Sequence, residues 1–313
     1  LLAMGNTCVL KPAPDTPWNA TRLGRLIAEQ TDIPPGVVNI VTSADHLVGE
    51  VLSTSAEVDM VAFTGSTATG RRILEAAAPT LKRVFLELGG KSVNLVLDDA
   101  DLEATLAGSA VCCMHGGQGC AIPTRLLVPR SHYDEAVEMA RTAFENWAYG
   151  DPTDLSVLQG PQISRRQQER VLDYIQQGRA EGATLVTGGG RPDHLDRGWY
   201  VEPTLFADVD NAMVIAQEEI FGPVLTMIPY SDVNEAVAIA NDTVYGLSGY
   251  VSGDPEQARA VANRLRTGNV HLNGAAPDFA TAFGGYKQSG VGREWGKFGF
   301  DEFLEIKVLF QPA

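Results

Sequence analysis

Residues 58–78, VDMVAFTGSTATGRRILEAAA, place an apolar run, a Thr-Gly-Ser turn and a helical pattern in direct succession. The same alternation occurs upstream, where TCVLKPA (7–13) precedes TRLGRLIAEQT (21–31) and VVNIVT (37–42) precedes a further helical stretch. Strands that alternate with helices of this length pair in parallel through right-handed crossovers. The sequence therefore predicts an α/β protein with a parallel sheet.

The series begins abruptly. Leu1 to Asn6 have the pattern of a helix end closed by Gly5, because glycine readily takes the left-handed conformation that follows a helix. We therefore expect earlier elements of the same sheet to precede Leu1.

A second α/β series begins at Lys91. Its predicted elements are SVNLVL (92–97), a small-residue helix through Cys112 and Cys113, TRLLVP (124–129), a helix from Tyr133 to Trp147, a helix and strand in 167–189, TMIPY (226–230), VNEAVAIAND (233–242), a long helix containing EQARAVANRL (256–265) and GNVHLN (268–273). The last segment, 301–312, alternates loosely as a strand does and could pair outside this lobe. A chain of 313 residues exceeds one usual core, so two lobes are expected.

Composition excludes several classes of function. The chain has 24 Lys and Arg against 39 Asp and Glu, a formal charge of -15, which repels nucleic acid and anionic membranes. No stretch is long and apolar enough to span a bilayer. The 4 cysteines are too few for a disulfide framework and fit reduced thiols in a cytosol-like compartment. The histidines are scattered, so no catalytic metal is predicted.

One short segment could bind a phosphate group. Gly65 and Ser66 end an apolar strand and open a helix of small residues, which exposes N–H groups to a pyrophosphate. An ordinary N-cap with a tight turn explains these two residues equally well. GGKS (89–92) resembles the end of a phosphate loop, but Phe85 stands where the first glycine of that motif belongs.

The segment HGGQGC (115–120) holds a candidate nucleophile. Its glycines bring the backbone close to the thiol of Cys120, as a residue reached by a substrate requires. The alternative for a lone cysteine is a small core residue, which is the role expected of Cys112 and Cys113 among Ala, Val and Met. The same role is expected of Cys8, whose apolar strand is predicted to be buried.

Glu87 is a candidate general base within the apolar segment FLELGGKS (85–92). A charged carboxylate is costly to bury there, so its pKa should rise toward neutrality, which suits a base. A structural ion pair, for example with Arg83, is the alternative. Glu219 in QEEIFGPV (217–224) precedes an apolar turn in the same way.

Taken in order, LKPAPDTP, FTGS, LELGGKS, GQGC, GPQ, EEIFGPV and FGGYKQSGVGRE closely resemble the signature segments of the aldehyde dehydrogenase superfamily. The resemblance implies an α/β fold with a partial Rossmann-type cofactor domain and an α/β catalytic domain. It divides the chain into the C-terminal part of the dinucleotide-binding domain (1–89), a catalytic domain (90–288) and a return to the cofactor domain with an oligomerisation tail (289–313).

The resemblance also implies residue roles. Cys120 would be the nucleophile and Glu87 the base that activates water. The implied cofactor-binding residues are Lys11 at the adenosine ribose, Gly65 and Ser66 at the pyrophosphate, and Glu219 and Phe221 at the nicotinamide riboside. Arg83, Arg293 and Glu305 would brace a subunit interface.

The implied activity is oxidation of a small-molecule aldehyde to a carboxylic acid with NAD or NADP, through a cysteine thiohemiacetal and thioester, in a cytoplasmic homodimer or homotetramer. NAD is favoured, although Pro14 stands where many NAD-preferring members have a glutamate. The family's N-terminal segment, including an asparagine of the oxyanion hole, has no counterpart in these residues. A non-catalytic fragment or pseudoenzyme of the same fold, acting through assembly, is therefore the alternative function.

Overall fold

The computed structural model describes residues 1–312, which form two compact units. Unit 1 consists of Leu1–Leu86, Asp278–Phe283 and the residues from Val291 onward. Unit 2 consists of Glu87–Pro277 and Gly284–Gly290.

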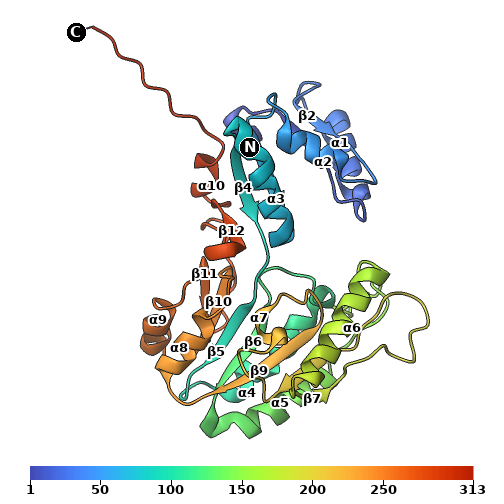
Figure 1. Cartoon of the computed structure of the whole chain (residues 1–313), viewed down its shortest axis with the longest axis vertical. Coiled ribbons are helices and arrows are strands. Elements are labelled where there is room, and N and C mark those ends of the chain that lie inside the picture. Colours follow the sequence, from blue (N-terminus) through green and yellow to red (C-terminus); the bar gives the residue numbers. More distant parts are fainter. Residues whose placement is uncertain (313) are drawn as a thin grey trace. The chain divides into compact units, whose positions relative to one another are not determined.

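The strands and helices alternate through most of the chain (Figure 1). The strands are β1 (Cys8–Leu10), β2 (Val38–Ile40), β3 (Met60–Thr64), β4 (Arg83–Glu87), β5 (Ser92–Val96), β6 (Pro123–Pro129), β7 (Thr184–Thr187), β8 (Thr204–Ala207), β9 (Val224–Tyr230), β10 (Ser248–Ser252), β11 (Asn269–Leu272) and β12 (Gly290–Val291). The α-helices are α1 (Pro17–Gln30), α2 (Leu47–Thr54), α3 (Thr67–Ala77), α4 (Leu102–Ala107), α5 (Tyr133–Glu145), α6 (Arg165–Ala180), α7 (Val214–Gln217), α8 (Val233–Asn241), α9 (Pro255–Ala262) and α10 (Phe298–Asp301). Short 3-10 helices include η1 (Leu2–Met4) and η3 (Ser109–Gly117).

Unit 2 is built on a 7-stranded sheet of order β11-β10-β5-β6-β9-β8-β7. Its strand pairs are parallel except β7 with β8, which are antiparallel. Leu95 and its neighbours on one face pack with α6, α7, α8 and α9, while Val96 and its neighbours on the other face pack with α4, η3 and α5. Because both faces are covered, β5, β8 and β9 are buried at nearly every position, as is typical of a parallel sheet with helices on both faces.

The helices of unit 2 bury one face and begin at side-chain caps. In α5, the buried residues Tyr133, Ala136, Ala140 and Phe144 follow the helical period. Ser164 caps α6 by accepting the N–H of Gln167 at 3.2 Å, which satisfies one of the free N–H groups at the helix start.

Unit 1 contains a parallel β1–β2 pair and a 3-stranded sheet of order β12-β4-β3, with α1, α2 and α3. The N-terminal helix end is confirmed as η1, with Gly5 at a φ of 79°. The expectation that Cys8 lies in a buried strand is wrong, since Cys8 is half-buried and the next residue, Val9, is 46% exposed. No residue of α1 is buried, and Trp18 is 81% exposed.

The predicted α/β fold class is confirmed, with local differences. The helix expected around residues 256–265 is α9, which ends at Ala262 because the chain turns there before β11. Residues 304–312, which have a strand-like pattern, form neither helix nor strand in this chain. Within residues 1–312, no helix combines the length and the apolar content that a membrane span requires.

Candidate active site

The residues before Cys120 form a turn of unusual backbone conformation. His115, Gly116 and Gly117 have successive φ angles of 55°, 67° and 71°, a region that glycine enters at little cost and other residues seldom enter. A Cβ atom on Gly117 would also lie 2.1 Å from the carbonyl carbon of Gly222. The path of the backbone therefore requires the glycines of HGGQGC.

Two glutamines hold this turn in place. Gln118 donates from Nε2 to the carbonyl oxygen of His115 (2.9 Å) and accepts the N–H of Ile163 at Oε1 (2.9 Å). Gln162 donates from Nε2 to the carbonyl oxygen of Gly116 (2.8 Å). The sequence motifs GQGC and GPQ are thus tied to each other by side chains to which sequence analysis assigned no role.

Cys120 follows the turn directly and is half-buried. Burial raises the pKa of its thiol, and the carboxylates of Glu219 and Glu87 raise it further, while the backbone N–H groups of Cys120 and Ala121 lower it. Gly90 runs so close that a Cβ atom on it would lie 2.3 Å from the carbonyl oxygen of Cys120. The predicted residues Cys120, Glu87 and Glu219 therefore lie within one site of unit 2.

Glu87 ends β4 and is only 2% exposed. Leu86 and Leu88, which flank it in the sequence, are also buried. The burial expected from the apolar segment is therefore observed.

Glu219 is fixed against the turn that follows Glu87. Its Oε1 accepts the N–H of Gly90 at 3.0 Å. Burial raises the pKa of Glu219, whereas this hydrogen bond and the nearby Lys91 lower it. Phe221 lies in the same loop, and its φ of 58° places it in the left-handed region of backbone conformation.

The residues expected at the adenosine ribose and the pyrophosphate lie in unit 1. Ser66 caps α3 by accepting the N–H of Thr69 at 3.3 Å, which is the N-cap that the sequence offered as an alternative. Gly65 precedes it, and Lys11 follows β1 and donates from Nζ to the carbonyl oxygen of Pro12 at 2.7 Å. The N-cap does not exclude anion binding, because a helix start has several free N–H groups.

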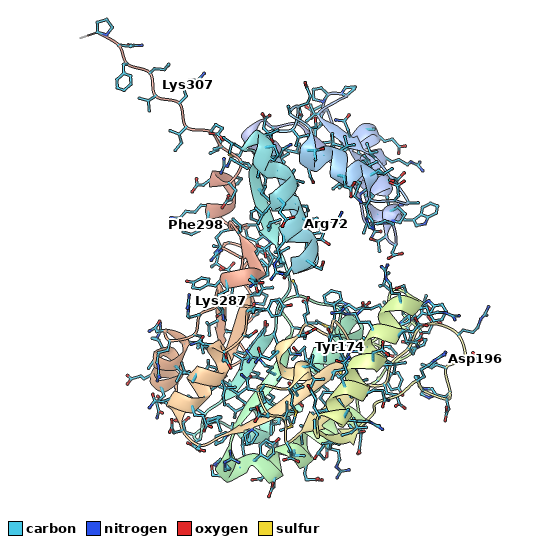
Figure 2. All side chains as sticks on the ribbon, viewed as in Figure 1. Arg72, Tyr174, Asp196, Lys287, Phe298 and Lys307 are labelled. Carbon is cyan, nitrogen blue, oxygen red and sulfur yellow. The ribbon has the colours of Figure 1, made fainter. Side chains whose placement is uncertain are left out.

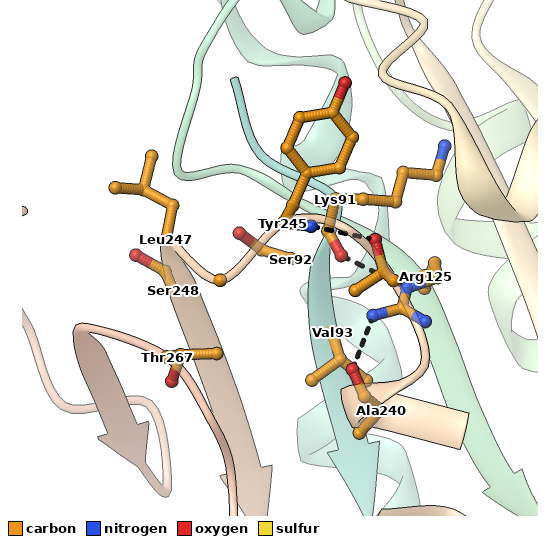
Figure 3. Close-up of a pocket in the computed structure, with 11 residues that line it drawn as sticks. Lys91, Ser92, Val93, Arg125, Ala240, Tyr245, Leu247, Ser248 and Thr267 are labelled. Atoms are coloured by element: carbon orange, nitrogen blue, oxygen red, sulfur yellow. Dashed lines mark hydrogen bonds between the residues drawn. The ribbon is translucent and has the colours of Figure 1, made fainter. Parts of the chain in front are cut away.

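Two buried cations that the sequence did not single out, Lys91 and Arg125, lie close to each other in unit 2 (Figure 3). Arg125 donates from Nε to the carbonyl oxygen of Lys91 (3.1 Å) and from its terminal nitrogens to those of Ile239 and Ala240 (both 2.9 Å). Burial, with Arg125 as the next cause, lowers the pKa of Lys91 to about 7. A charged residue inside the apolar run TRLLVP was the available signal for Arg125, because such a charge needs buried partners.

Comparison with known proteins identifies the family of this α/β chain. The model of the aldehyde dehydrogenase family matches residues 1–309. The chain therefore belongs to the aldehyde dehydrogenase family.

Curated relatives include the 3-succinoylsemialdehyde-pyridine dehydrogenase of Pseudomonas sp, which is 54% identical over 98% of this chain and 65% of its own length. A putative aldehyde dehydrogenase of Staphylococcus aureus is 46% identical, with the same shares covered. The chain thus spans about 65% of the length of these relatives.

Two solved structures resemble the chain closely. The Mycobacterium tuberculosis aldehyde dehydrogenase complexed with NAD+ is 46% identical with a TM-score of 0.92, over 95% of this chain and 62% of that one. A mutant of aldehyde dehydrogenase C from Pseudomonas syringae, with NAD+ and octanal, is 44% identical with a TM-score of 0.95, over 98% and 64%.

Proposed function

We propose that this protein, extended to the length of its relatives, oxidises an aldehyde to a carboxylic acid. Cys120 is the nucleophile and NAD or NADP is the hydride acceptor. The extended form is called the full-length protein. The observation that supports this most directly is the gathering of Cys120, Glu87 and Glu219 in one site of an aldehyde dehydrogenase family member. A nucleophile beside a buried carboxylate is the arrangement that acyl transfer followed by hydrolysis needs.

In the first half-reaction, the Cys120 thiolate forms a bond to the aldehyde carbon, and the carbonyl oxygen becomes an oxyanion. The backbone N–H of Cys120 is the donor that this chain offers to the oxyanion. When bound, the nicotinamide cofactor supplies the acceptor for the hydride that leaves the same carbon. A thioester then remains on the Cys120 sulfur.

In the second half-reaction, Glu87 takes a proton from water as the water oxygen attacks the thioester carbon. The carbon–sulfur bond breaks, the carboxylic acid leaves and the Cys120 thiolate is restored. Because Glu87 can activate water, hydrolysis is favoured over transfer of the acyl group to coenzyme A.

In each unit, residues offer groups of the kind that bind part of a dinucleotide cofactor. Glu219 offers a carboxylate to ribose hydroxyls, and α3, which is 11 residues long, offers N–H groups beside Ser66 to a pyrophosphate. Lys11 and Phe221 complete the proposed contacts. The NAD+ in the M. tuberculosis and P. syringae structures supports the choice of NAD over NADP.

The domain assignment follows from the same resemblance and stays a proposal. Residues 1–89 and 289–313 would belong to the cofactor and oligomerisation parts, and 90–288 to the catalytic part. A cytoplasmic homo-oligomer that accepts a small aldehyde is proposed for the full-length protein. The octanal in the P. syringae structure supports an aldehyde as substrate.

The test replaces single cysteines in the full-length protein and measures reduced cofactor formed with a panel of aldehydes. Cys120→Ala should abolish activity, whereas Cys112→Ala and Cys113→Ala should retain most of it, because both residues belong to the buried core. Limited iodoacetamide followed by mass spectrometry should find Cys120 modified first. Equal losses from all 3 substitutions of these cysteines would contradict the proposal.

A further inference from the structure

Helix α6 holds the loop that contains Glu219. Residues 167, 170 and 174 are spaced by three and four positions, so their side chains lie along one face of the helix. The hydrogen bonds from this face are Gln167 Nε2 to the carbonyl oxygens of Ile220 (3.2 Å) and Phe221 (2.8 Å), Arg170 Nη2 to the carbonyl oxygen of Glu219 (2.9 Å), and the Tyr174 hydroxyl to Glu218 Oε2 (2.5 Å). Four consecutive residues of the loop are therefore held by one helix.

The Tyr174 hydroxyl is the central group of this arrangement. Figure 2 marks the position of Tyr174 in the chain. It accepts a hydrogen bond from Arg170 Nη2 at 3.1 Å while donating to Glu218. The Arg170 guanidinium also lies 4.9 Å from the centre of the Tyr174 ring. Burial and the Glu218 hydrogen bond raise the pKa of Tyr174 to about 12, so the hydroxyl remains a donor at neutral pH.

The loop held by α6 contacts both segments of the candidate active site. At Glu219, its carboxylate accepts the Gly90 N–H at 3.0 Å. At Gly222, its backbone lies against Gly117 in the turn before Cys120. A displacement of the loop would therefore move the Glu219 carboxylate and disturb the turn that presents the nucleophile.

We propose that Tyr174 is a positioning residue for the cofactor: acting through Glu218 and Arg170, it keeps the Glu219 carboxylate at the Gly90 N–H. The inference rests on the proposed role of Glu219 at the nicotinamide ribose. Tyr174 acts on the cofactor site without contacting cofactor or substrate. Its removal should weaken cofactor binding more than aldehyde binding.

The experiment compares Tyr174→Phe with Tyr200→Phe in the full-length protein. Tyr200 is a matched control, because it is equally buried in unit 2 and its hydroxyl donates to the carbonyl oxygen of Gly150 at 2.8 Å, outside the Glu219 loop. Tyr174→Phe should raise the KM and Kd for NAD about tenfold, the lower end of the effect of losing a hydrogen bond to a charged group. The aldehyde KM should change less than about twofold in both variants.

A second pair of variants tests the same hydrogen bond from its acceptor, so that the test still works if Tyr174→Phe does not fold. Glu218→Gln retains an acceptor for the Tyr174 hydroxyl and should lose less NAD affinity than Glu218→Ala. Equal NAD affinities in these two variants would overturn the proposal. So would a Tyr174→Phe protein whose melting temperature falls while its NAD KM matches that of Tyr200→Phe, because the role would then be structural only.

Glu219→Gln separates this inference from the function on which it rests. If Glu219→Gln weakens NAD binding but Tyr174→Phe does not, the positioning role is wrong and the proposed role of Glu219 stands. If Glu219→Gln leaves NAD binding unchanged, both are wrong. Weaker NAD binding in both variants, with the aldehyde KM preserved, supports both.

Discussion

Replacing Glu87 with glutamine should separate the two half-reactions. The amide has nearly the size of the carboxylate but cannot take a proton from water, so thioester hydrolysis should slow about 10²- to 10⁴-fold, the range of general base catalysis. The attack of Cys120 on the aldehyde does not use this base. One equivalent of reduced cofactor per active site should form in a burst, followed by little turnover.

The electrostatics of the site determine how fast that burst should be. Three causes raise the pKa of Cys120: burial is the largest, the Glu219 carboxylate is the second and the Glu87 carboxylate is the third. Glutamine removes this negative charge, so the thiol pKa should fall and more thiolate should be present at neutral pH. The burst of Glu87→Gln should therefore be no slower than that of the unaltered protein.

The assay is rapid mixing of the full-length protein with aldehyde and NAD, followed by absorbance of the reduced nicotinamide. Glu103→Gln, at an exposed carboxylate of α4, is the control and should turn over normally. Normal steady-state turnover of Glu87→Gln would show that another residue activates the water. A missing burst would show that Glu87 takes part in acylation, which would also refute the reasoning.

The remaining predictions concern the thiol, the turn before it and the chain as a whole. Burial and carboxylates raise the pKa of Cys120, so its alkylation by iodoacetamide should keep accelerating as the pH rises through the usual thiol range. Glu219→Gln should move this dependence of the alkylation rate on pH to lower pH. An unchanged pH dependence would contradict the electrostatic explanation. Gly117→Ala should lower the melting temperature and abolish activity, since left-handed backbone strain alone costs about 1–3 kcal/mol and the new Cβ would also meet Gly222. The control Gly150→Ala should be neutral, because a Cβ atom there meets open space. Equal melting temperatures of the two variants would refute the prediction. The 313-residue chain alone should be less soluble than the full-length protein and show little turnover, because apolar side chains such as Trp18 and Val9 are exposed; comparable turnover numbers would refute this.

The sheet of unit 2 was predictable because its strands are short apolar runs between amphipathic helices. SVNLVL and TRLLVP became β5 and β6, the parallel centre of the sheet. The antiparallel pairing of β7 was not predictable, because it depends on the path of the chain between residues 188 and 203. Residues 304–312 form no strand within this chain, and local alternation does not reveal a partner outside it, so the pairing of this segment stays a prediction.

Within the candidate site, the sequence points to the proposed reacting groups but not to the residues that support them. Cys120 and Glu87 stand out because a thiol among glycines and a carboxylate in an apolar strand are locally unusual. Arg125 and Tyr174 do not, since their partners are distant in sequence: Arg125 reaches Ile239 across 114 positions, and Tyr174 reaches Glu218 across 44. Such pairings depend on tertiary structure, so only the cost of burying a polar group hints at them.

Close contacts between backbone segments explain why the motifs of this site are rich in glycine. Gly90 approaches the backbone of Cys120, and Gly117 approaches the backbone of Gly222, at distances that a Cβ atom would prevent. Backbone segments that pack this closely have little freedom to shift, so the positions of the Cys120 sulfur and the Glu219 carboxylate are set by main-chain contacts and by hydrogen bonds from α6. Side chains elsewhere in the site can then change without moving Cys120 or Glu219.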